Sequence, residues 1–318
     1  MSKLKTPIII SNWKSNPKSL SEAKKTLEKL SKEFDILQKK NKKNKSLNFL
    51  LSLPSPFIFP IQTFINEKKN RNLKNILIGA QNFDEVEVSN INNSISLTQL
   101  KSVGAQFVIL NDSDIFHEEN ILENINDKEM EKAKKEDRKN GKIEANKILL
   151  ERLNGVSRKI EEEKREESKI ISPALKKLEK LEEKIRATLE NGVIAIFFIK
   201  ENNLEDFKSI NEIIKKTIKN LHYNLFDKLI ICYEPGGEFS KIEQTDMDDC
   251  LEKTIAIRRT VANMFGIDNA KKIKIVYSGK ITENNIKEIM KSGGVDGVLV
   301  NEESLSPEVL AKIIYTIK

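Results

Sequence analysis

The sequence has few of the features that mark secreted, metal-binding or membrane-spanning proteins. Its two cysteines, Cys232 and Cys250, are too few for a disulfide framework and lack the spacing of metal ligands. The first residues carry no apolar segment like that of a signal peptide. No run approaches the roughly 18 apolar residues of a transmembrane helix. We therefore expect a cytoplasmic protein with no membrane partner.

Aromatic residues are also scarce, at 6%, and charges of the two signs nearly balance. The 55 basic and 48 acidic side chains leave a formal net charge of +7, but both signs are interspersed along the chain. A nucleic-acid-binding protein would gather its basic residues into a patch, with aromatic side chains for base stacking. The sequence contains no such patch, so we expect no nucleic-acid partner.

Eight short apolar runs alternate with amphipathic, helix-like stretches. The runs are almost continuously apolar, as expected for parallel strands that are buried on both faces. Alternating strands and helices indicate an α/β fold, and eight such units predict closure into a (β/α)8 barrel, the TIM barrel. The runs are Pro7–Ser11, Leu47–Leu53, Ile76–Gln81, Phe107–Leu110, Val193–Phe198, Leu229–Tyr233, Lys274–Tyr277 and Gly297–Val300.

A densely charged segment, residues 127–190, interrupts this alternation. From Ile171 to Leu189 its apolar residues recur in steps of three and four, which is typical of one face of a helix. Ser172 and Pro173 are suited to begin that helix, as cap and first residue. The predicted domains are a barrel, 1–119 and 180–318, and a charged helical or coiled-coil insertion, 120–179, after strand four. The insertion is either a solvated hairpin without a role or an arm that binds a protein partner.

Six short motifs occur in order along the chain, each in or directly after a predicted strand. They are Ser11–Asn16, Pro54–Phe57, Gly79–Asn82, Gly104–Leu110, Tyr233–Pro235, and Asp296–Val300 followed by Ser304–Leu305. Together they resemble the motifs of the triosephosphate isomerase family, over most of the chain outside the insertion. The resemblance implies an enzyme of glycolysis that interconverts dihydroxyacetone phosphate and glyceraldehyde 3-phosphate, as a homodimer and without a metal or an organic cofactor.

In this family a carboxylate base takes a carbon-bound proton while an electrophile stabilises the oxyanion of the enediolate. The family is itself the standard example of a glutamate base paired with a neutral histidine. By position, Glu234 matches the base and Asn12 matches the asparagine of the oxyanion site. Lys14 matches the lysine that offers positive charge to the phosphate and the enediolate.

Asp112 stands at the position of the electrophilic histidine. An ionised aspartate only accepts hydrogen bonds, so it would repel the developing oxyanion instead of donating to it. His117 matches a later histidine of the family, and we expect His222 either at the surface or in a packing role. Neither is a predicted replacement for the electrophile.

The phosphate-binding sequences differ as well. Gly279 and Lys280 stand in the loop after strand seven and are the candidate phosphate-binding residues. After strand eight, Asn301 and Glu302 replace a glycine pair, and the glutamate adds bulk and a like charge. Further differences fall at Phe197–Ile199 after strand five, in the lid at Gly236–Lys241 and in the dimer-forming loop at Ile91–Ser96.

The sequence is compatible with three functions and does not decide among them. The first is a divergent isomerase of this family with impaired or lost activity. The second is a non-catalytic barrel that binds a protein partner through the insertion. The third is isomerisation of another small sugar or carbonyl compound, with Lys280 holding an anion.

Overall fold

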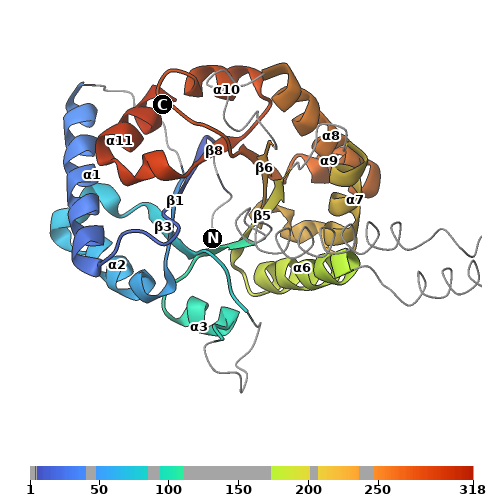
Figure 1. Cartoon of the computed structure of the whole chain (residues 1–318), viewed down its shortest axis with the longest axis horizontal. Coiled ribbons are helices and arrows are strands. Elements are labelled where there is room, and N and C mark those ends of the chain that lie inside the picture. Colours follow the sequence, from blue (N-terminus) through green and yellow to red (C-terminus); the bar gives the residue numbers. More distant parts are fainter. Residues whose placement is uncertain are drawn as a thin grey trace, which may run out of the picture. The chain divides into compact units, whose positions relative to one another are not determined.

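A computed structural model of the chain shows a closed barrel of parallel strands (Figure 1). It describes residues 4, 6–40, 48–84, 94–110, 173–200, 207–235 and 247–317. The chain divides into two units, Met1–Asp112 with Leu181–Lys318, and Ser113–Lys180. Most of the predicted insertion, 120–179, lies outside the described residues. Its role as a separate domain and its coiled-coil character therefore stay predictions.

Each of the eight strands pairs in parallel with the next in sequence order, and β8 pairs with β1. This closure confirms the predicted (β/α)8 fold. The strands are β1 (Ile8–Asn12), β2 (Asn48–Leu53), β3 (Ile76–Ala80), β4 (Phe107–Leu110), β5 (Ile194–Lys200), β6 (Leu229–Glu234), β7 (Lys274–Tyr277) and β8 (Gly297–Val300).

The fifth strand extends two residues beyond its predicted end at Phe198. Phe197 and Ile199 are buried within β5, so the prediction that Phe197–Ile199 follow strand five was wrong. The physical reason is that the apolar run continues through Ile199, and each of its residues packs on one face of the strand or the other.

Alternate residues of each strand face the barrel axis, because strand side chains point in turn to the two faces of a sheet. The buried cluster that fills the barrel follows this period of two. It contains Ile8 and Ile10 of β1, Leu50 of β2, Phe107 and Ile109 of β4, Ile194, Ile196 and Phe198 of β5, Ile230 and Cys232 of β6, Val276 of β7 and Leu299 of β8.

The helices lie around the strands (Figure 1). None of those in the described part of the chain is long and apolar enough to cross a membrane. They are α1 (Leu20–Lys40), α2 (Ile58–Ile65), α3 (Leu97–Ser102), α6 (Pro173–Glu190), α7 (Phe207–Ile218), α8 (Met247–Phe265), α9 (Ile267–Ala270), α10 (Ile286–Ser292) and α11 (Pro307–Thr316).

Short-range sequence signals account for the first residues of two helices. Ser96 begins α3 with a capping box, in which its Oγ accepts from the Gln99 N–H at 3.1 Å and Gln99 Oε1 accepts from the Ser96 N–H at 2.9 Å. Pro173 begins α6, as its sequence predicts. However, α6 runs unbroken from Pro173 to Glu190, so the predicted domain boundary at residue 180 falls inside one helix.

A cluster of charges joins α8 to the amino-terminal ends of β7 and β8. Asp296 Oδ2 accepts from Arg258 Nη2 at 2.7 Å and from the Ile275 N–H at 2.9 Å. Lys274 Nζ lies 3.6 Å from Asp296 Oδ1. The amino-terminal face of such a barrel is the face whose residues serve stability, opposite the face that carries active sites.

We predict that Asp296→Asn lowers the free energy of unfolding by about 2 kcal/mol, because the charged bond to Arg258 is lost while the guanidinium stays half-buried. Urea unfolding measures this change. Asp268→Asn is the control: Asp268 is 95% exposed and lies 3.4 Å from Lys271, so we expect no measurable effect. Equal results for the two variants would contradict the assigned role of Asp296.

Candidate active site

The predicted site residues of β1 and β6 lie at the carboxyl ends of these strands and face the barrel axis. Asn12 follows the core residue Ile10 by two positions in β1, and Glu234 follows the core residue Cys232 in the same way in β6. The period of two therefore directs both side chains inward, above the apolar core. The carboxyl end of the strands is where (β/α)8 enzymes place their active sites.

Lys14 has an unusual backbone conformation that hydrogen bonds hold in place. Its φ is +48°, in the left-handed region that a lysine rarely adopts. Asn12 Oδ1 accepts from the Lys14 N–H at 3.2 Å, and Gln81 Nε2 donates to the Lys14 carbonyl oxygen at 2.6 Å. Gln81 Nε2 also lies 3.4 Å from Asn12 Oδ1. Strained backbone that its surroundings hold fixed is found most often at functional sites.

Gln81 thus joins Asn12 and Lys14 from the residue directly after β3. The motif Gly79–Asn82 contributed to the family resemblance, but no role for Gln81 was predicted. The sequence feature that could have identified Gln81 is its position directly after a buried strand. The carboxyl ends of parallel barrel strands meet at one end of the barrel, where active sites lie.

Glu234 is held by neighbours on both adjacent strands. Ser278 Oγ, directly after β7, donates to Glu234 Oε2 at 3.3 Å. Lys200 Nζ, the last residue of β5, lies 3.4 Å from Glu234 Oε1. The exposed fractions of the side chains are 14% for Glu234 and 22% for Lys200, so the ion pair is largely shielded from water.

The sequence analysis missed Lys200, because the predicted strand ended two residues too early. In the sheet, Lys200 is the register partner of Glu234, two positions beyond the pair Phe198 and Cys232. Both members of that earlier pair belong to the buried cluster inside the barrel. The period of two therefore places the Lys200 ammonium on the same inner face as the Glu234 carboxylate.

The loop after β7 is fixed by packing and by hydrogen bonds of its own. A Cβ on Gly279 would lie 2.3 Å from Tyr277 Oη, so only glycine fits beneath the buried ring of Tyr277. Asn285 Nδ2 donates to the Lys280 carbonyl oxygen at 2.8 Å. Gly279 therefore has a packing role that is independent of any bound phosphate.

After β8, the residues that replace the family's glycine pair begin a short 3-10 helix, Glu302–Leu305. The Glu302 side chain is exposed. Asn301 directly precedes the helix, and its carbonyl oxygen accepts from the Ser304 N–H at 3.0 Å. This carbonyl oxygen faces the helix backbone, as expected for a residue that leads into a helical turn.

Several predicted positions lie outside the described residues, namely Asp112, His117, the lid at 236–241 and the first half of the loop at 91–96, residues 91–93. His222 is exposed, which agrees with the first of its two predicted placements, and its Nδ1 lies 2.6 Å from Asn224 Oδ1. Within the described residues, no group of three or more His, Cys, Asp and Glu side chains is arranged to hold a metal ion.

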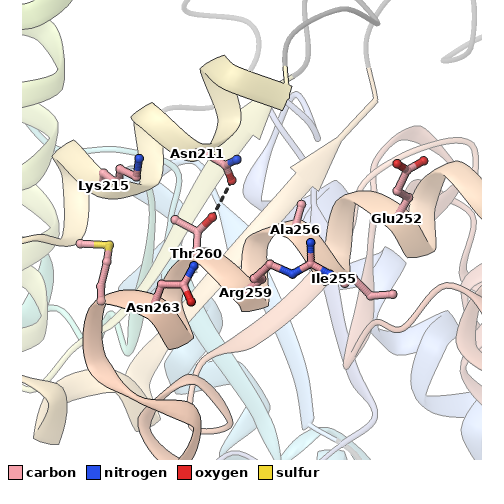
Figure 2. A pocket seen from close by; sticks show the side chains of 9 residues that line it. Asn211, Lys215, Glu252, Ile255, Ala256, Arg259, Thr260 and Asn263 are labelled. Carbon is pink, nitrogen blue, oxygen red and sulfur yellow. Dashed lines mark hydrogen bonds between the residues drawn. The ribbon is translucent and has the colours of Figure 1, made fainter.

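A separate groove of about 730 Å³ lies between α7 and α8 (Figure 2). Thr260 Oγ1 donates to Asn211 Oδ1 across it at 2.5 Å. Charged side chains line the groove beside apolar ones, as Arg259, Glu252 and Ile255 illustrate. None of the predicted site residues lines this groove, so it is distinct from the residues at the strand ends.

Comparison with known proteins agrees with this geometry. The model of the family described as triosephosphate isomerase matches residues 7–140 and 173–317. The triosephosphate isomerase of Finegoldia magna is 28% identical over 315 residues, which cover 98% of both chains. That of Aquifex aeolicus is 33% identical over 143 residues, 43% of this chain and 57% of the relative. That of Dictyoglomus turgidum is 28% identical over 139 residues, 42% of this chain and 56% of the relative. The last two matches thus span little more than half of each relative.

We predict that Gln81→Met lowers the free energy of unfolding by about 1–2 kcal/mol, because the Lys14 carbonyl oxygen loses its donor. Urea unfolding again provides the measurement. Gln62→Met is the matched control, since Gln62 Oε1 is buried and accepts no hydrogen bond from the described residues. A loss no greater than that of the control would show that Gln81 does not hold the Lys14 segment.

Proposed function

Because this chain belongs to the triosephosphate isomerase family, we propose that it carries a divergent isomerase site whose turnover of dihydroxyacetone phosphate and glyceraldehyde 3-phosphate is impaired or lost. The observation that carries the proposal is the surroundings of Glu234, the family's base. This carboxylate is retained at the end of β6, but Lys200 and Ser278 hold both of its oxygens. At least one of these contacts must break, at some cost, before a carboxylate oxygen can reach a substrate carbon.

The retained side chains support proton transfer next to a carbonyl group. In the proposed reaction Glu234 removes the proton from one carbon and returns it to the neighbouring carbon. Lys14 and Asn12 contact the phosphate and the developing oxyanion, and Lys280 contributes positive charge near the phosphate. Side chains supply all of this chemistry, so the proposal includes no metal and no organic cofactor.

The proposed impairment follows from the replaced residues. Asp112 cannot donate a hydrogen bond to an oxyanion while it is ionised. Loss of one such donor typically lowers kcat by about 10²–10³. Asn301 and Glu302 further weaken a phosphate site that the family builds from glycine backbone, since Glu302 brings a charge of the same sign as the ligand.

A non-catalytic role is the alternative, favoured by the charged segment within 120–179. In this alternative the barrel is a scaffold and the insertion binds a protein partner. A cytoplasmic location, a place in glycolysis and a homodimer stay predictions from the sequence and the family resemblance.

We predict that the purified chain isomerises glyceraldehyde 3-phosphate at least about 10²-fold more slowly than the Finegoldia magna relative, because one oxyanion donor is lost. A coupled assay measures both rates under the same conditions. Glu234→Gln is the control for contaminating host enzyme. A rate equal to that of the relative would contradict the proposed impairment.

A ligand test separates a chain with a site from a chain without one. The probe is 2-phosphoglycolate, whose carboxylate resembles the enediolate and whose phosphate resembles that of the substrate. Because a ligand that binds only the folded state stabilises it, a concentration of 100 times Kd should add about 2.7 kcal/mol to the free energy of unfolding. An unchanged unfolding curve at millimolar probe would contradict the presence of a site and favour the scaffold alternative.

A further inference from the structure

Lys200 places a positive charge at the carboxyl end of the barrel, in a position that the family resemblance did not identify as functional. Its ammonium lies 3.4 Å from Glu234 Oε1, and the two side chains are 22% and 14% exposed. Desolvation of two charges costs about as much as their attraction contributes, so a partly buried ion pair is weak support for stability alone. Its position at the active-site end of the fold favours a functional role.

The strand order places Lys200 between the base and the altered electrophile position. β5 pairs with β4 on one side and with β6 on the other. The segment directly after β4 contains Asp112, at the position where the family has its electrophile. Glu234 ends β6 on the other side. Lys200 is therefore one strand spacing, about 4.8 Å, from Glu234. It lies three positions beyond Phe197, the register partner of Leu110 at the end of β4.

We propose that Lys200 is a ligand-binding residue whose ammonium donates to the oxyanion end of a phosphorylated enediolate or a similar anion. In this role it supplies the donor that Asp112 does not. The inference rests on the proposed function and adds Lys200 to the residues of that site.

The chemistry balances without a further reactant. Glu234 takes the carbon-bound proton, the electrons of that C–H bond form the enediolate double bond, and the carbonyl π electrons move to oxygen. Lys200 donates a hydrogen bond to this oxyanion and keeps its proton. An ammonium has three N–H donors, so Lys200 can contact Glu234 and the ligand at the same time. Glu234 then returns its proton to the carbon that bears the oxyanion. The hydroxyl proton on the first carbon passes within the ligand to the oxyanion, so that the first carbon becomes the carbonyl carbon.

The test is the affinity of the full chain for 2-phosphoglycolate, measured by calorimetry, together with steady-state isomerisation. Lys200→Met is the variant, and Lys228→Met is its matched control. Lys228 is also half-buried, but it donates to the Gly192 carbonyl oxygen at 3.1 Å directly before β6, at the opposite end of the barrel.

We expect Lys200→Met to weaken binding of 2-phosphoglycolate by about tenfold or more, because it removes a charged hydrogen bond. The control should bind like the parent chain. If the parent chain turns over substrate above the Glu234→Gln background, Lys200→Met should lower kcat by about 10²–10³ with a smaller change in KM.

The two proposals fail in different ways. Equal affinity of Lys200→Met and the parent chain overturns the role of Lys200, even when the parent is an active isomerase. Absence of any binding by the parent chain overturns it as well. Turnover no greater than that of Glu234→Gln refutes isomerisation of this substrate, whereas Lys200-dependent binding in the same protein still supports the anion-binding role.

A chemical rescue guards against a folding defect in Lys200→Met. Lys200→Cys, alkylated with 2-bromoethylamine, restores an ammonium on a side chain of nearly the same length. Cys232 and Cys250 are 0% and 1% exposed, so the folded protein shields both from the reagent. Restored affinity after alkylation supports the proposal, and weak binding by the fully alkylated protein overturns it.

Discussion

The pairing of eight parallel strands into a closed ring determines which side chains meet at the active-site end of this barrel. Every strand alternates between its two faces, so a residue two positions beyond a core side chain must face the barrel axis. This rule places Asn12, Lys200 and Glu234 above the apolar core. It also makes Lys200 and Glu234 direct neighbours, because they are register partners of β5 and β6. The candidate site follows from this register more than from any single loop.

The surroundings of Glu234 differ from those expected of a general base that waits for substrate. One oxygen faces an ammonium and the other accepts a hydroxyl hydrogen bond. In the proposed role, the same ammonium also donates to an anionic ligand. Lys200 therefore restrains the carboxylate and, in the proposed role, also supplies positive charge to the ligand. The hydrogen bonds among Asn12, Lys14 and Gln81 hold Lys14 in its left-handed backbone conformation.

Much of the fold could be predicted from the sequence, because buried parallel strands are apolar on both faces and stand out as short runs. Three of the predicted strands have the bounds found in the structure: Phe107–Leu110, Lys274–Tyr277 and Gly297–Val300. The end of β5 was missed because Phe197–Ile199 were matched to a motif that follows the strand in the family, although the apolar run continues through Ile199. Gln81 was missed because its bonds reach 67 residues back along the chain, a contact that only the closed barrel creates.

The most direct test of this account is a double-mutant cycle on the free energy of unfolding with Lys200→Met, Glu234→Gln and the double variant. If the two side chains meet as the register of β5 and β6 dictates, the loss of unfolding free energy in the double variant should differ from the sum of the two single losses by about 0.5–3 kcal/mol. Additivity within about 0.3 kcal/mol would mean that the ion pair does not form in the folded protein, and would contradict the proposed arrangement of the site.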